Sequence, residues 1–154
     1  LNNQIHLNTC RYIFKMTEWS WNILLLSCND IIYLDRFNNN NTYDYQHIDF
    51  SLSVPTVNPM SEWGTRFNAN YDGYPENYSF VTYPNVNNSY NLIYEFRTMH
   101  NPPIQYCKNV SRLYPSIIFI LSFDYYNINT EITFINGESF LPTSSSSENE
   151  YSSE

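Results

Sequence analysis

The sequence predicts an α+β fold: a ferredoxin-like two-layer sandwich with a mainly antiparallel sheet and two helices on one face. Two segments carry the apolar spacing of helices, and a group of strands separates them. The predicted strands outnumber the helices, in the order β-α-β-β-β-α-β-β. A chain of 154 residues, 42% of them hydrophobic, is long enough for one domain with a single core. Together these observations favour the ferredoxin-like plan with an added strand or two.

The first predicted strand leads directly into the first helix. The apolar stretch 19–27 predicts a mostly buried strand. A helix follows, because Asn29 or Asp30 can cap its first turn and apolar residues recur along one face. The residues of that face are Ile31, Leu34 and Phe37. The asparagines at 38–41 are expected to end the helix, since asparagine tolerates the left-handed conformation of a helix end.

Two more strands and a long loop are predicted next. Apolar side chains alternate through 47–55, which is typical of a strand, and Pro55 ends it. The stretch EWGTRFNA, residues 62–69, predicts another strand. Residues 70–89 are rich in turn-forming residues, and the segment is too long for a simple hairpin loop.

A strand and the clearest helix of the chain come after the loop. Residues 90–98 read as a strand. The helix begins at Asn101 or Pro102 and ends at Pro115, since proline is tolerated in a first turn and breaks a helix further on. Its predicted buried face consists of Ile104, Cys107, Val110 and Leu113 or Tyr114.

A final hairpin completes the predicted sheet. Apolar residues alternate through 116–126, and a turn leads into a second strand at 130–137. The alternating residues of the first strand are Ile117, Phe119, Leu121, Phe123 and Tyr125. Gly137 is expected to close the ordered region.

The chain is expected to have three parts. Residues 1–15 precede the first methionine, Met16, and are interpreted as an upstream extension or arm. Residues 16–140 form the predicted ferredoxin-like domain. Residues 141–154 are rich in serine and glutamate, and this composition predicts a disordered tail.

Charge and composition exclude several classes of function. The net charge is −8, and 7 basic residues are too few for the positive stripe that nucleic-acid binding usually requires, so no nucleic-acid partner is expected. With 3 glycines, a glycine-rich phosphate loop is not expected either, and no cofactor or metal is predicted. No apolar run is long enough to span a membrane, and no signal peptide is recognisable. The 3 widely spaced cysteines favour a reducing compartment.

Three stretches in order resemble YubB-like domains, small accessory proteins of phages and plasmids. MTEWSWNILLLS resembles the start of that family, and EWGTRFNA its Trp-Gly-Thr-Lys-Trp-Asx-Ala signature, with Arg66 and Phe67 in place of Lys and Trp. The stretch YEFRTMHNPPIQYCKNVSRLYPSIIFILSFDY resembles its later strand, second helix and following strand. His100 stands there in place of a Trp. The resemblance implies a ferredoxin-like fold and a domain start at Met16, and it implies no activity.

The stretch WGTRF is the first candidate site. Trp63 offers a stacking face, Thr65 a hydroxyl and Arg66 a guanidinium that can pair with a carboxylate or phosphate, while Asn68 would add an amide. If this strand lay beside residues 90–98, further polar side chains could join the same end of the sheet. These are Arg97, Thr98, His100 and Asn101.

A structural interpretation of the same stretch needs no ligand. Gly64 permits a bulge or a close backbone approach. Strand alternation then puts Trp63, Thr65 and Phe67 on the helix-covered face, and Arg66 points outward to pair with a surface acid such as Glu95.

Other groupings of reactive residues predict no reaction. Cys107 and His100 have the elements of a thiol nucleophile and its base, but the cysteine lies on the apolar stripe of its helix. His47 could bind a metal together with two nearby carboxylates, those of Asp44 and Asp49. Carboxylates that flank the last hairpin could in principle act as acid and base: Asp124, Glu131 and Glu138.

The sequence therefore favours a non-enzymatic accessory protein of a phage, plasmid or virus, located in the host cytoplasm. It would act as a protein-interaction module whose tyrosine-rich, acidic surface binds a protein partner. Tyrosines gather in the long loop: Tyr71, Tyr74, Tyr78 and Tyr83. The alternative is a small-molecule-binding or enzymatic site around Trp63, Arg66, Arg97 and His100. RNA binding on an open sheet face is a third hypothesis, which the acidity disfavours.

Overall fold

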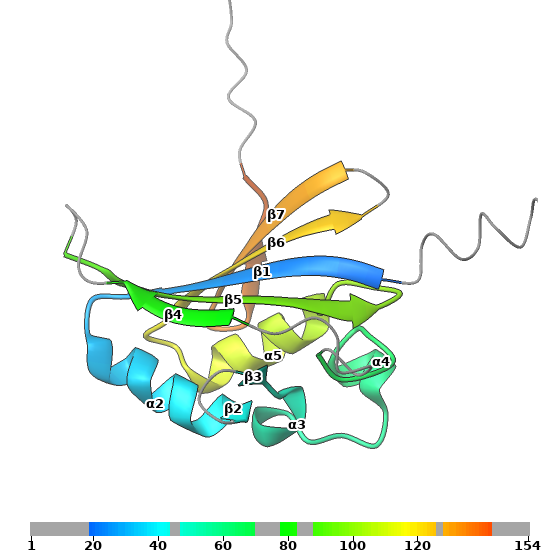
Figure 1. Ribbon diagram of the computed structural model, residues 1–154, viewed down its shortest axis with the longest axis horizontal. Coiled ribbons are helices and arrows are strands. Elements are labelled where there is room, and N and C mark those ends of the chain that lie inside the picture. The colour runs from blue at the N-terminus through cyan, green and yellow to red at the C-terminus, as the bar shows by residue number, and fades with distance from the viewer. Residues whose placement is uncertain (1–18, 44–46, 70–77, 83–87, 126–127, 143–154) are drawn as a thin grey trace, which may run out of the picture.

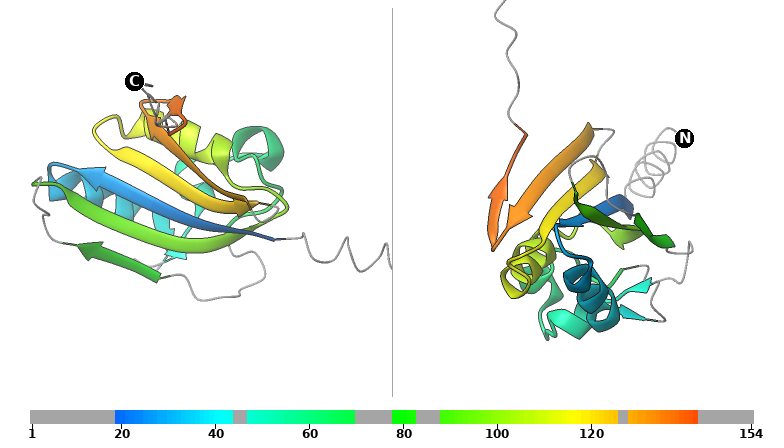
Figure 2. Two further views of the ribbon diagram at one scale, coloured as in Figure 1. Left: turned by 90° about the horizontal axis from the view of Figure 1, so that it is seen from above. Right: turned by 90° about the vertical axis from the view of Figure 1, so that its left-hand side faces the viewer.

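A six-stranded antiparallel sheet dominates the computed structural model, which describes residues 19–43, 47–69, 78–82, 88–125 and 128–142. Across the sheet the strands are β4 (Tyr78–Thr82), β5 (Tyr90–Met99), β1 (Trp19–Cys28), β6 (Ile118–Tyr125), β7 (Ile128–Ile135) and β8 (Glu138–Phe140). The described helices all lie on one side of this sheet (Figures 1 and 2). They are α2 (Ile31–Asn41), α3 (Phe50–Ser53), α4 (Pro59–Glu62) and α5 (Ile104–Leu113).

The predicted α+β two-layer sandwich with an antiparallel sheet is confirmed. The two long helices, α2 and α5, share one face of the sheet as expected (Figure 1). The strand order β4-β5-β1-β6 is compatible with ferredoxin-like connectivity, and that finer description remains a prediction. A second, two-stranded ribbon of β2 (Thr42–Tyr43) and β3 (His47–Ile48) lies in the helical layer.

β1 occupies the centre of the sheet, between β5 and β6. Its residue Trp21 lies opposite Arg97 on one side and opposite Asp124 on the other. Side chains alternate along β1, so that Leu24 and Leu26 point toward the helices and are fully buried. The covered face of the sheet packs on both long helices. Fully buried residues on the two sides include Leu92, Tyr94, Phe119 and Leu121 from strands, and Leu34, Phe37, Cys107 and Val110 from helices.

α2 begins where the sequence predicts but extends further. The Asp30 carboxylate caps it by accepting a hydrogen bond from the Ile32 backbone N–H at 3.0 Å. The predicted stop at residues 38–41 is wrong, since the helix includes all of them. Asn41 is buried, and its amide donates hydrogen bonds to the Phe37 carbonyl and to the Tyr114 hydroxyl. These contacts offset the low helix propensity of asparagine.

The predicted strand at 47–55 is wrong beyond its first two residues. The Asp49 carboxylate accepts a hydrogen bond from the Ser51 backbone N–H at 2.9 Å and so caps the short helix α3. Phe50 is fully buried, and its ring stacks on that of Tyr106 with 4.1 Å between the centroids. Helix capping and this aromatic contact outweigh the strand-like alternation, which would have buried Leu52, now an exposed side chain.

The second half of the chain follows the prediction closely, with four differences. β7 begins at Ile128 and ends at Ile135, so it starts and ends two residues before the predicted strand at 130–137. β4, which pairs with β5, lies inside the segment that was expected to be a loop. α5 begins at Ile104, two or three residues later than expected, and its last residue, Leu113, is exposed. The short strand β8 extends the sheet beyond Gly137, the residue expected to close the ordered region.

Candidate functional site

The loop that contains Trp63 belongs to the helical layer, so the predicted strand at 62–69 is wrong. α4 ends at Glu62, and the chain then turns through Gly64, whose φ is +79°. The expected close backbone approach is present, because a Cβ built on Gly64 would lie 3.3 Å from the Gln105 backbone nitrogen. The Trp63 backbone oxygen also accepts a hydrogen bond from the Tyr106 N–H. The loop is therefore packed against the start of α5.

Trp63 and Thr65 are core residues in this loop. The Trp63 indole N–H donates to the Val54 carbonyl at 2.7 Å, and its ring packs edge-on against Phe50. Thr65 is fully buried, and its hydroxyl donates to the Phe67 carbonyl at 2.9 Å. Neither side chain offers a surface to a ligand in solution.

Arg66 and Asn68 have different surroundings from those predicted. The exposed Arg66 guanidinium lies over the Phe67 ring, 5.5 Å from its centroid, and within the described chain no ion pair joins it to Glu95. The Asn68 side chain accepts a hydrogen bond from the Phe50 backbone N–H and donates one to the Asp49 carboxylate at 2.6 Å. Asn68 thus ties the loop to the start of α3.

The remaining predicted site residues lie at one end of β5 but not on one face. Arg97 is on the sheet face opposite the helices, whereas Thr98 is fully buried. The Thr98 hydroxyl donates to the Asn101 carbonyl at 2.6 Å and so fixes the turn after the strand. His100 is exposed in that turn, with a φ of +70°. The structure therefore divides the predicted set between the two layers.

Of the predicted groove residues, Asn101 is the one that lines a hollow beside the loop. Gly64 and Asn101 line a hollow of about 570 Å³ beside the start of α5. Its other lining residues are Met60, Ser61, Pro102, Ile104, Gln105, Phe123 and Thr130. No charged side chain lines this hollow, and Trp63, Arg66, Arg97 and His100 are not among its walls.

The candidate catalytic groupings do not assemble in the described residues. Cys107 is fully buried, and this burial raises the pKa of its thiol, which stays protonated, while His100 is exposed. In the described ranges, no three His, Cys, Asp or Glu side chains come together as a metal site would require. Asp44 lies outside these ranges, as do the side chains of Tyr71, Tyr74, Tyr78 and Tyr83.

The sheet face turned away from the helices, here called the open face, is the more informative surface. Twelve of its side chains are Trp19, Trp21, Ile23, Leu25, Ile93, Glu95, Arg97, Ile118, Ile120, Ser122, Asp124 and Glu131. Three of the apolar ones are strongly exposed: Trp21 at 53%, Ile23 at 46% and Ile118 at 40%. Figure 1 shows no described helix over this face.

The start of β1 has an inverted burial pattern. Ser20 and Asn22 are buried beneath the sheet, with exposed fractions of 1% and 2%, while Trp21 between them is half exposed. Hydrogen bonds satisfy the buried pair. The Asn22 amide donates to the Ser20 carbonyl at 2.9 Å and to the Thr98 hydroxyl at 3.0 Å, and the Ser20 hydroxyl donates to the Asn22 side-chain oxygen. Polar side chains thus occupy the core here, and apolar ones face outward.

Two tryptophans and one arginine lie side by side on the open face. The Arg97 guanidinium carbon is 4.3 Å from the centroid of the Trp19 ring and 6.0 Å from that of Trp21. Both distances are within the range of cation–π attraction. The spacing of two between the tryptophans places both side chains on the same side of the strand.

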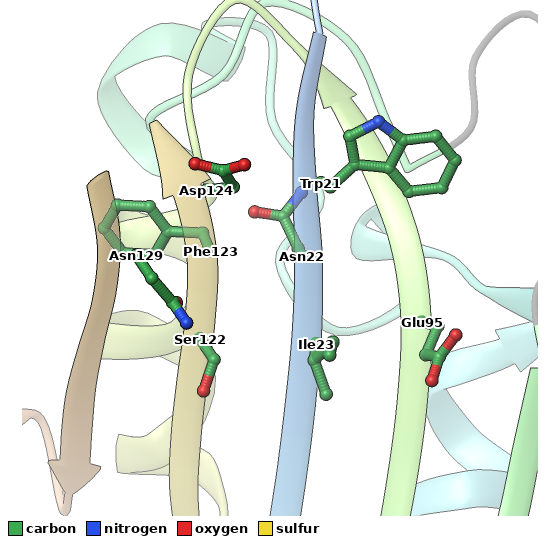
Figure 3. Close-up of a pocket in the computed structure, with 8 residues that line it drawn as sticks. All are labelled: Trp21, Asn22, Ile23, Glu95, Ser122, Phe123, Asp124 and Asn129. Carbon is green, nitrogen blue, oxygen red and sulfur yellow. The ribbon is translucent and has the colours of Figure 1, made fainter. Parts of the chain in front are cut away.

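A hollow of about 390 Å³ lies on the open face between β5, β1 and β6. It is lined by Trp21, Asn22, Ile23, Glu95, Ser122, Phe123, Asp124 and Asn129. Figure 3 shows Asp124 and the Trp21 ring on opposite sides of β1, with Ser122 further along β6 and Glu95 on β5. Ile23, directly opposite both Ser122 and Glu95, lies between them.

Trp21 and Ile23 are absent from the sequence-predicted site. The stretch 19–27 is apolar almost throughout, so its composition does not decide which side faces water. The one feature of the stretch that distinguishes its two faces is the pair of polar residues at alternate positions, Ser20 and Asn22. Simple amphipathic patterning would have placed that pair outside, on the wrong face.

Comparisons of the chain with protein-family models, curated proteins and solved structures gave no significant match. The resemblance to YubB-like domains therefore remains a prediction. In the described parts of the chain, no helix has the length and apolar character needed to cross a bilayer.

Proposed function

We propose that the chain is a non-enzymatic protein-interaction module that binds its partner through the open face. The inverted burial at the start of β1 carries this proposal: a tryptophan and an isoleucine are half exposed beside two buried polar residues. Folded chains usually bury such side chains, and a contiguous exposed apolar surface marks interaction sites. Tryptophan is also enriched among the residues that dominate binding energy at protein interfaces.

The alternative small-molecule or enzymatic site receives less support from the geometry. Trp63 is buried in the helical layer, whereas Arg97 lies on the opposite side of the sheet. A reaction would need converging groups, and the fully buried Cys107 has no access to the exposed His100.

An RNA-binding role is also weakly supported, although exposed aromatic rings on a sheet can stack bases. Three carboxylates lie on the open face, those of Glu95, Asp124 and Glu131. The described positive charge there is that of Arg97. This excess of negative charge would repel a phosphate backbone, which makes protein the better-supported partner.

The biological setting that we propose is that of an accessory protein of a phage, plasmid or virus, acting in the host cytoplasm. It rests on the resemblance to YubB-like domains and on the wide spacing of the 3 cysteines.

Selection of short random-sequence peptides displayed on phage tests the proposed surface without a known partner. The full chain would be compared with a double variant, Ile23→Gln and Ile118→Gln, which removes apolar area from the open face. Val57→Gln is the matched control, because Val57 is fully exposed in the loop between α3 and α4. Circular dichroism would establish that all three proteins are folded.

We expect peptide families that bind the wild type and Val57→Gln and lose binding to the double variant. If every selected family binds the double variant equally well, the open face is not the interaction surface and the proposal fails. Saturable binding of a single-stranded oligoribonucleotide that the double variant abolishes would instead favour the RNA hypothesis.

A further inference from the structure

The hollow on the open face combines an apolar centre with two negative walls. Ile23 lies in its centre, Trp21 and Asp124 lie at one end, and Glu95 lies at the other. Trp21 and Asp124 are directly opposite each other in the β1–β6 register, and so are Ile23 and Glu95 in the β1–β5 register. Side chains in such pairs project from the same face as close neighbours.

The two carboxylates of the hollow have no counter-charge within the described chain. Asp124 and Glu95 make neither an ion pair nor a side-chain hydrogen bond with any described residue. Glu131, further along β7, accepts a hydrogen bond from the Ser122 hydroxyl at 3.3 Å. The Arg97 guanidinium, the described cation of this face, lies over the Trp19 ring. An incoming positive charge would therefore meet two carboxylates that no described side chain engages.

A second copy of the chain is a poor occupant for this face. Each copy has a net charge of −8, and a symmetric contact between two open faces would bring together the carboxylates around both hollows. Like charges brought into contact oppose association. The complementary surface is one that is apolar and basic.

We infer that the hollow receives an arginine or lysine side chain, presented by an otherwise apolar segment of a partner protein. This inference rests on the proposed function. The methylene groups of such a side chain would pack on Ile23 and Trp21, while its charged end reaches Asp124 or Glu95. The indole of Trp21, on the β5 side of β1, adds apolar area to this contact. The open apolar residues around the hollow, such as Ile118, contact the remainder of the segment.

A double-mutant cycle between peptide and protein tests the inference. The peptides are the selected ones whose binding depends on Ile23 and Ile118. Each is also made in a neutral form, in which citrulline replaces arginine or glutamine replaces lysine. The proteins are the full chain, Asp124→Asn, Glu95→Gln and the control Asp35→Asn. Asp35 is exposed on α2, so the control changes the net charge equally in the other layer. Dissociation constants would be measured by fluorescence anisotropy at two salt concentrations.

We expect Asp124→Asn or Glu95→Gln to weaken binding of the basic peptide about fivefold, as does the neutral replacement in the peptide. The two changes together should be little worse than either alone, since both remove one contact. Asp35→Asn should leave the affinity within the error of measurement. Raising the salt concentration should reduce the affinity of the basic peptide and spare that of its neutral form.

Failures of the inference and of the proposed function give different results. Two results overturn the inference and leave the proposed function intact. In the first, the peptides that depend on the open face contain no Arg or Lys. In the second, their basic residue shows no coupling energy with Asp124 in Asp124→Asn or with Glu95 in Glu95→Gln. The absence of any face-dependent peptide overturns both. Analytical ultracentrifugation could instead show that the wild type is a dimer and that the double variant Ile23→Gln and Ile118→Gln is a monomer. This result would assign the open face to a second copy of the chain and would also overturn the inference.

Discussion

The covered and open faces of the sheet differ most at the start of β1. On the covered face, Ser20 and Asn22 are buried and hydrogen-bonded, and Leu24 continues the row into the apolar core. On the open face, Trp21 and Ile23 keep about half of their surface in water. Core packing and internal hydrogen bonds explain the first row, whereas the second exposes apolar area that folding does not use. At the start of β1, substitutions of even-numbered residues should therefore lower the stability of the fold, and substitutions of odd-numbered residues should weaken binding of a partner.

The largest expected effect contrasts two neighbours on β1. Leu24→Ala removes a fully buried side chain and should lower the free energy of unfolding by about 2–5 kcal/mol. Ile23→Ala removes a side chain that is 46% exposed and should lower it by about 1 kcal/mol. Denaturant titration followed by circular dichroism measures both. If both variants lost the same free energy of unfolding, Ile23 would be as buried in solution as Leu24, and the two faces would not differ as described.

Asn22→Ala tests the polar part of the covered face. The change removes the amide that donates to the Ser20 carbonyl and the Thr98 hydroxyl, so buried acceptors lose a partner. The free energy of unfolding should fall by about 1–3 kcal/mol. Asn129→Ala, at an exposed position of β7, should change it by less than about 0.5 kcal/mol. If Asn22→Ala left the free energy of unfolding unchanged, the hydrogen bonds of Asn22 would not stabilise the fold.

Gly64→Val tests the docking of the helical layer. The positive φ of Gly64 and the nearby Gln105 backbone nitrogen disfavour any β-branched side chain, so unfolding should become easier by about 1–3 kcal/mol. Gly64→Ala should lower the free energy of unfolding less than Gly64→Val does, because alanine has the same backbone strain but a smaller side chain than valine. Thermal unfolding measures both variants. Binding of face-dependent peptides should persist in each while it remains folded.

Two arginine substitutions give the smallest expected effects. Arg97→Ala removes a guanidinium held over Trp19 and should lower the free energy of unfolding by about 1–2 kcal/mol. Arg66→Ala removes an exposed cation over Phe67 and should lower it by less than about 1 kcal/mol. The ligand groove predicted around Arg66 would gain support only if this neutral change also abolished binding of a ligand.

The long, regular elements could be predicted from the sequence because their own residues determine them. β1, β5, α5 and β6 each carry a sustained apolar pattern, and Asp30 marks the start of α2. Short elements could not be predicted in this way. Phe50 alternates like a strand residue, but it packs on Tyr106 from a region 56 residues away in the chain, and such contacts leave no local pattern.

The candidate site was less predictable than the fold. Trp63 was a predicted site residue because it is aromatic and lies beside glycine and arginine, yet its indole N–H donates to the Val54 carbonyl inside the core. Trp21 lies in a stretch that is apolar almost throughout, and only the packing of both helices on one face of the sheet leaves it outside. Which side of an apolar strand meets water is decided by the other layer, so sequence spacing alone does not contain that information.

The central position of β1 has a consequence for synthesis of the chain. Its partners come much later: Trp19 pairs with Met99 and Trp21 with Asp124, so neither edge of β1 can be filled until most of the chain has been made. Pairings so distant in sequence close large loops and form slowly. An emerging apolar strand without its neighbours is prone to aggregate. The nascent chain should therefore require protection by chaperones until β6 has left the ribosome, and slower elongation before β6 should lower the yield of folded protein.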